Sequence, residues 1–94
     1  MLDIPRELVT ELARLLRAER RTRGTRAGTR RLTSFRQALL VLVWFRTKGD
    51  VRVVGAGFGV SRATAYRYRD EGITVLAEQA PDLHEALQQV AERG

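Results

Sequence analysis

The stretch "VVGAGFGVSRATAYRYRDEG", residues 53–72, decides the fold. It begins with glycines at alternate positions and continues into arginines and tyrosines. Glycines in such a run form either a loop that cradles phosphate or a place where two backbones pass close together. The dinucleotide-binding fingerprint is G-x-G-x-x-G, but here Val60 stands where its last glycine belongs, and no P-loop lysine follows. We therefore exclude a nucleotide site.

A helix-turn-helix fits the same stretch better. Such a unit needs a small residue where its two helices cross and a residue that tolerates positive φ in the turn. Gly59 suits the turn, and Gly55 suits the crossing. Gly57 is unfavourable, because glycine inside a helix costs about 1 kcal/mol relative to alanine, so we expect a short first helix. The apolar residues that surround the turn are Val54, Phe58 and Val60.

The second helix of the unit is predicted to start after Ser61, which caps it, and to turn Ala65 and Tyr68 inward. Its outward positions are then Arg62, Ala63, Tyr66, Arg67 and Asp70. In a helix-turn-helix this helix enters the major groove of DNA, where arginine can bond guanine with both arms of its guanidinium. Tyr66 fits a packing role equally well. The predicted base contacts are Ser61, Arg62, Ala63, Tyr66 and Arg67.

The distribution of charge predicts a polyanionic partner. The chain has 94 residues, which is compatible with one small domain, and it carries a net charge of +6. Residues 1–19 carry net −1, residues 20–69 carry net +12 with Asp50 as their one acid, and residues 70–94 carry net −5. A codon bias toward arginine would explain arginine in place of lysine, but not why acids avoid the middle of the chain.

Other features of the composition exclude several classes of protein. The sequence has no cysteine and one histidine, His84, so we expect no metal site, no cysteine nucleophile and no cofactor. The longest apolar run, residues 38–45, is too short for a membrane span, which needs about 20 residues. No secretion signal is recognisable at the N-terminus. We expect a cytoplasmic protein.

The rest of the chain divides into three parts. Residues 1–19 predict an amphipathic helix with Leu8, Leu12, Leu15 and Leu16 on one face, suited to packing within the chain or to dimerisation. Residues 20–33 predict an arginine-rich arm, for which a solvated linker is the alternative. Residues 34–94 predict the helix-turn-helix domain and a C-terminal helix. The predicted phosphate contacts are Arg20, Arg21, Arg23, Arg26, Arg30, Arg31 and Arg69.

Capping patterns predict where two further helices begin. Ser34 and Gln37 have capping-box spacing at the start of a helix that should run to about residue 48. Its centre, residues 38–45, is apolar on every side, so we expect it to be buried, with Trp44 and Phe45 in the core. Residues 73–80 either extend the recognition helix or form a new helix after Gly72. Asp82 and Glu85 have the same capping-box spacing at the start of the last helix, with His84 expected on its surface.

The segments "LTSFRQALLVLVWFRTKGD" (32–50) and "GVSRATAYRYRDEGITVLAEQAPDLHEAL" (59–87) resemble the N-terminal helix-turn-helix domain of insertion-sequence transposases of the DDE superfamily, of the actinobacterial type. The resemblance covers about residues 32–88 and is most specific at "SRATAYRY" and "APDLHE". It implies binding to the terminal inverted repeats of a transposon. In that family a downstream RNase H-like domain cuts DNA with metal-bound acids, and this chain stops at Gly94, before any such domain. The resemblance therefore implies DNA binding without catalysis.

Together these observations predict an all-α fold, a small helix-turn-helix bundle of about five helices with an arginine-rich loop, that binds double-stranded DNA. A free-standing transcriptional repressor is one alternative. A protein-interaction or dimerisation module, with a homodimer formed through the leucine face of residues 1–19, is another.

Overall fold

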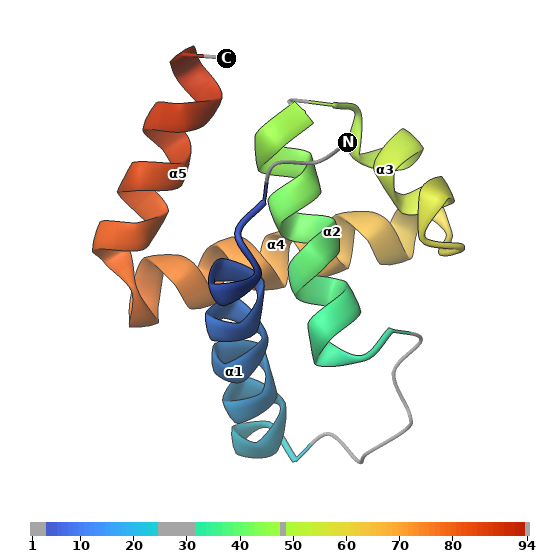
Figure 1. The fold of residues 1–94 in the computed structure, drawn as a ribbon. Helices are drawn as coiled ribbons and strands as arrows, with labels where there is room; N and C mark the ends of the chain where they lie inside the picture. Colours follow the sequence, from blue (N-terminus) through green and yellow to red (C-terminus); the bar gives the residue numbers. More distant parts are fainter. Residues whose placement is uncertain (1–3, 25–31, 48, 94) are drawn as a thin grey trace.

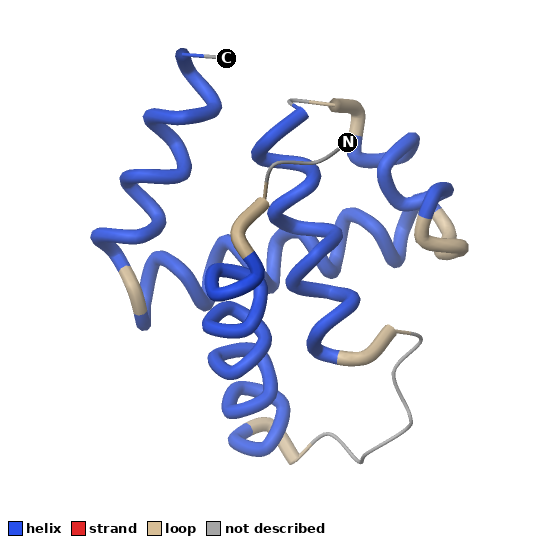
Figure 2. Tube along the Cα trace, viewed as in Figure 1, coloured by secondary structure: helices blue, strands red, loops and turns tan. Residues whose placement is uncertain are grey.

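The computed structural model describes residues 4–24, 32–47 and 49–93, and all regular structure in these ranges is helical (Figure 2). Five helices follow one another along the chain. They are α1 (Arg6–Thr22), α2 (Ser34–Thr47), α3 (Val51–Gly57), α4 (Arg62–Gln79) and α5 (Pro81–Arg93). The predicted all-α class with about five helices is confirmed.

The helices form a bundle that α4 crosses. In Figure 1, α1 and α2 lie side by side and run in opposite directions, and α4 passes behind both. The short α3 packs against α4 and α2 at one end, and α5 packs against α2 and α4 at the other. The long α4 therefore belongs both to the core and to the helix-turn-helix.

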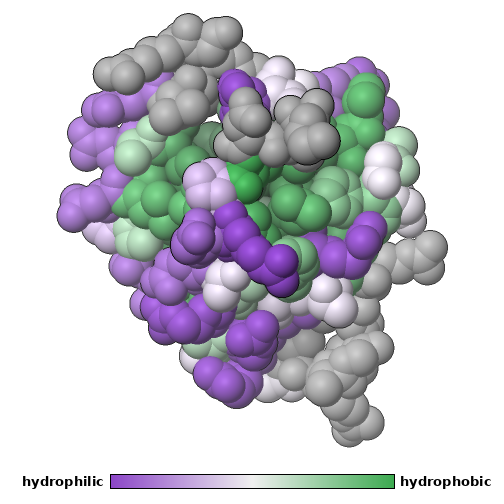
Figure 3. Space-filling model, in the orientation of Figure 1, coloured by the Kyte–Doolittle hydropathy of each residue, from purple (hydrophilic) through white to green (hydrophobic). Residues whose placement is uncertain are grey.

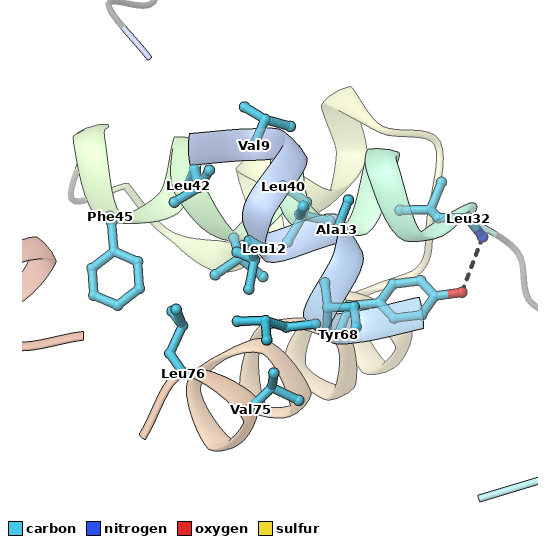
Figure 4. Close-up of a cluster of buried hydrophobic side chains, with 14 of the residues drawn as sticks. Val9, Leu12, Ala13, Leu32, Leu40, Leu42, Phe45, Tyr68, Val75 and Leu76 are labelled. Carbon is cyan, nitrogen blue, oxygen red and sulfur yellow. Dashed lines mark hydrogen bonds between the residues drawn. The ribbon is translucent and has the colours of Figure 1, made fainter. Parts of the chain in front are cut away.

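The core forms where α1, α2 and α4 meet (Figure 4). Leu12 of α1, Leu40 of α2, and Tyr68 and Leu76 of α4 are all fully buried. Of the predicted leucine face, Leu12, Leu15 and Leu16 are buried and Leu8 is partly buried. Packing within the chain, rather than dimerisation, therefore accounts for this face. Figure 3 shows apolar side chains gathered at the centre of one face, with hydrophilic ones around them.

Glycine at position 72 allows α4 to continue as one helix across α2. A Cβ atom at Gly72 would lie 2.5 Å from Cγ2 of Val41, whose side chain is fully buried. Of the two alternatives for residues 73–80, the structure shows the extended recognition helix. Glycine is present here because the side chain of Val41 on α2 occupies the space that a Cβ atom would need, and not because the helix ends.

Both predicted capping boxes are wrong. The hydroxyl of Thr33, rather than that of Ser34, accepts a bond from the backbone N–H of Arg36 at 3.2 Å. Gln37 is fully buried, and its side chain bonds to other elements. α5 begins at Pro81, so Asp82 lies inside the helix and cannot be its N-cap.

His84 is also placed differently from the prediction. It is half-buried, and its ring meets that of Phe45 edge to face, with 6.4 Å between the centroids. Leu83 and Leu87, on the same helix, pack against the core, whereas Ala86 is exposed. His84 therefore helps to attach α5 to α2.

Candidate nucleic-acid interface

The turn between α3 and α4 has the geometry of a Schellman motif. Gly59 has φ of +74°. Its N–H donates to the carbonyl of Ala56 at 3.0 Å, and the N–H of Val60 donates to the carbonyl of Gly55 at 3.1 Å. These two bonds satisfy the last carbonyls of α3, and they require a left-handed residue at position 59. The predicted turn is confirmed at Gly59.

The crossing of α3 and α4 depends on Gly55. A Cβ atom at this position would lie less than 3.0 Å from Cβ of Ala65, closer than real Cβ atoms come. Ala65 is fully buried, so neither residue has room to move aside. Gly57, two residues later, is exposed and has nothing within 4 Å of its Cβ position. The predicted crossing at Gly55 is confirmed, and α3 is short, with seven residues.

Ser61 is the N-cap of α4, as predicted. Its oxygen accepts a bond from the backbone N–H of Thr64 at 3.2 Å, and its hydroxyl donates to Oγ1 of Thr64 at 3.0 Å. The side chain is exposed but already has partners in its own helix. If Ser61 contacts a base, as predicted, it must use the same hydroxyl that caps the helix.

The first turns of α4 present the predicted face to solvent. Ala65 and Tyr68 are fully buried against the rest of the bundle. The exposed residues on the outward side are Arg62, Ala63, Tyr66, Arg67 and Asp70. The predicted orientation of this helix is thus confirmed, whereas the contacts of these side chains with DNA remain predictions.

The start of α3 adds an ion pair that the sequence analysis missed. Asp50 is the N-cap of α3, accepting from the N–H of Arg52 at 2.8 Å, and its carboxylate also pairs with the guanidinium of Arg52. These bonds, and to a lesser extent the nearby charge of Arg62, lower the pKa of Asp50 to about 2. Asp50 and Arg52 therefore lie at the start of a helix that packs against α4, with Asp50 close to the charge of Arg62. The N-cap pattern at residue 50 could have indicated this pair.

The arginine-rich segment is only partly an arm. α1 continues to Thr22, past its predicted end, so Arg20 and Arg21 are helical. Arg21 and Arg23 are exposed, and Arg23 lies 3.6 Å from the carboxylate of Glu19. The remaining predicted phosphate contacts of this segment, Arg26, Arg30 and Arg31, lie outside the described residues.

Arg20 belongs to a polar network inside the protein. Its Nη2 donates to the carbonyl of Leu32 at 2.9 Å and to Oε1 of Gln37 at 2.7 Å. The amide nitrogen of Gln37 donates in turn to the carbonyl of Tyr68 and to Glu71. The hydroxyl of Tyr68 accepts from the N–H of Leu32 at 3.0 Å (Figure 4). The network joins the end of α1, the start of α2 and the middle of α4, so Arg20 has a structural role, and its contact with phosphate remains a prediction.

Arg69 lies close to two aromatic rings. Its guanidinium carbon lies 5.1 Å from the ring centroid of Trp44 and 5.2 Å from that of Tyr66. Nε and Nη2 of Arg69 both donate to Oδ1 of Asp70, at 2.9 and 2.7 Å. Trp44, predicted to be a core residue, is only half-buried and packs at the edge of the core. Its neighbour Phe45 is buried, as predicted.

The described ranges contain neither a candidate metal site nor a membrane span. Among those residues, no group of three or more histidines and acids could hold a metal ion. None of their helices is both long and apolar enough to cross a membrane.

Comparison with protein families gives one match. Residues 30–82 match the family described as the helix-turn-helix of DDE superfamily endonuclease. Searches of curated proteins and of solved structures each gave no match. The matched segment contains α2, α3, α4 and the turn at Gly59.

Proposed function

Since the family model covers more than half of the chain, the protein belongs to the helix-turn-helix family of DDE superfamily endonucleases, and we propose that it binds double-stranded DNA sequence-specifically with the first turns of α4 in the major groove. The observation that carries the proposal is the exposed face of α4. Its side chains project from a helix whose other side is fixed in the core by Ala65 and Tyr68. Rigid presentation of side chains on a helix is what base reading requires.

The outward residues other than Asp70 each have a chemistry that suits a base pair. Arg62 lies in the first turn and can bond to O6 and N7 of guanine. Ala63 offers a methyl group that can pack against the methyl of thymine. Arg67 is five residues beyond Arg62, which turns it by roughly 140° around the helix, so the two do not share a base. Tyr66 lies between them and can reach a thymine methyl or the backbone.

The proposal also includes phosphate contacts by arginines outside α4. Arg21 and Arg23 are the exposed candidates at the end of α1, and Arg26, Arg30 and Arg31 follow them in the sequence. Arg52 joins this set because it is exposed on α3, which packs against α4. A phosphate oxygen could replace the carboxylate of Asp50 as the partner of Arg52 when DNA binds.

The target that best fits this family is the terminal inverted repeat of a transposon. In this proposal the chain recognises the transposon end, and cutting is the task of a catalytic domain that the matched residues do not contain. A repressor that acts on the transposon's own promoter would use the same surface. The two differ in symmetry, because a repressor dimer reads a two-fold site whereas a transposon end is asymmetric.

The test is selection of a binding site from random duplex DNA, followed by affinity measurements on every single-base variant of that site. Arg62→Ala should cost about 1–3 kcal/mol on the selected site and relax the preference at one base pair. Uniform weakening on all variants would contradict base reading by Arg62. Sedimentation of the protein with the selected site separates the symmetric repressor from the asymmetric transposon end. Absence of any selected site would refute the proposal.

A further inference from the structure

The arrangement around Arg69 differs from that of a solvent-exposed phosphate contact. Its side chain is 23% exposed, against 61% for its partner Asp70. The guanidinium is close to the rings of Trp44 and Tyr66 and also bonds the carboxylate of Asp70. A guanidinium near an aromatic ring is attracted to its negative face. Three partners, from α2 and from two other positions on α4, therefore hold one side chain.

We propose that Arg69 is a positioning residue for Tyr66, and that it sets how firmly Tyr66 reads DNA. This inference rests on the proposed function, because it concerns the same exposed face of α4. Tyr66 is 37% exposed. Where only solvent surrounds its ring, nothing prevents the ring from changing rotamer. Arg69, itself fixed by Trp44 and Asp70, gives that ring a preferred position before DNA arrives. A side chain that is already ordered loses less entropy on binding.

The same geometry makes Arg69 a poor phosphate contact. The carboxylate of Asp70 neutralises its charge and would repel a phosphate brought to the same place. The donors Nε and Nη2 are already bonded to Asp70. Arg69 should therefore contribute little to the release of counterions, which a direct phosphate contact would increase.

The variant that tests the proposal is Arg69→Gln, measured on the selected site with and without Tyr66→Ala. We expect Arg69→Gln to weaken binding about 2- to 12-fold, the range for one side chain that must be immobilised on binding. In the Tyr66→Ala background the loss should nearly disappear, and the slope of log affinity against log salt should stay unchanged. Arg17→Gln, at an exposed position of α1, is the control for removal of one positive charge.

A direct phosphate contact predicts different results. The slope would then flatten by about 0.9, and the effects of Arg69→Gln and Tyr66→Ala would be additive. Either of these outcomes overturns the inference while leaving the proposed function intact. If the wild-type protein selects no DNA site, both proposals fail together.

Two additional measurements separate positioning from general loss of structure. Trp44 is the one tryptophan of the chain, so its fluorescence in the free protein reports on its contact with Arg69. Arg69→Gln should change this emission without DNA, and an unchanged spectrum would overturn the inference. Arg69→Lys keeps the charge but lacks the planar guanidinium, so we expect partial rescue of affinity with a wild-type melting curve. This variant also provides the test if Arg69→Gln does not fold.

Discussion

Replacing Gly55 by alanine tests the central geometric claim, that α3 and α4 cross at this residue. The added Cβ would lie less than 3.0 Å from Cβ of Ala65. Ordinary contact between carbon atoms is at about 3.5–4.0 Å. The two helices must therefore separate by several tenths of an ångström or more. The clash involves two atoms attached directly to the backbone, so no rotamer change can relieve it.

The expected loss of stability follows from this overlap. Forcing one extra carbon into a packed site costs about 1–3 kcal/mol. In a domain of this size, each kcal/mol lowers the melting temperature by about 4–8 °C. We therefore expect Gly55→Ala to melt about 4–24 °C below wild type, as measured by circular dichroism. Binding should weaken as well, because displacement of α3 changes its position relative to the reading face of α4.

Gly57→Ala is the matched control. It adds the same methyl group to the same helix, two residues away, where nothing lies within 4 Å of the new atom. Alanine is favoured over glycine in a helix by up to about 1 kcal/mol, so this variant should be as stable as wild type or more so. If Gly55→Ala melts like Gly57→Ala and binds DNA normally, α3 and α4 do not cross at Gly55, and the reasoning is refuted.

Four other variants test separate parts of the structure. Gly59→Val should lose stability and DNA binding, because a β-branched residue is strained at φ of +74°; normal melting would mean that the turn lies elsewhere. Asp50→Asn keeps a capping side chain but removes the charge. Because the pKa of Asp50 is about 2 in the folded protein and about 3.9 in unfolded chains, wild type should be more stable than this variant at neutral pH. The difference should shrink as pH falls from about 4 toward 2 in denaturant titrations, and a difference independent of pH would argue against the ion pair with Arg52. Arg20→Gln should lower stability and leave the salt dependence of DNA binding unchanged. Arg21→Gln should keep the stability of wild type and flatten the slope of log affinity against log salt by about 0.9. The reverse pattern would contradict the placement of both residues.

The sequence was informative where one residue type is nearly obligatory. Positive φ in the turn, close approach at the crossing and N-cap chemistry each select few residues, and these requirements located Gly59, Gly55 and Ser61 correctly. The same constraints oriented α4, because a fixed helix start determines which side chains face outward. For this reason the outward face of α4 could be predicted from residue types and spacing alone.

Prediction failed where a polar side chain forms hydrogen bonds with residues of other helices. Ser34 and Gln37 have the spacing of a capping box, but Gln37 instead bonds Arg20, Tyr68 and Glu71, which lie 17 to 34 positions away in sequence. Local spacing carries no information about partners at such distances. The burial of His84 could not be predicted for the same reason, because its contact with Phe45 depends on how α5 packs against α2.

The count of arginines overestimates how many of them are free to meet DNA. Arg20 bonds Leu32 and Gln37, and Arg69 pairs with Asp70 close to two rings. A buried arginine must be paired, and a guanidinium with several donors can connect helices where a hydrophobic side chain could not. Part of the basic character of residues 20–69 is therefore used to hold α1, α2 and α4 together. Since those helices fix the orientation of the exposed face of α4, such arginines would serve the proposed DNA binding by positioning the exposed arginines to which we assign the contacts.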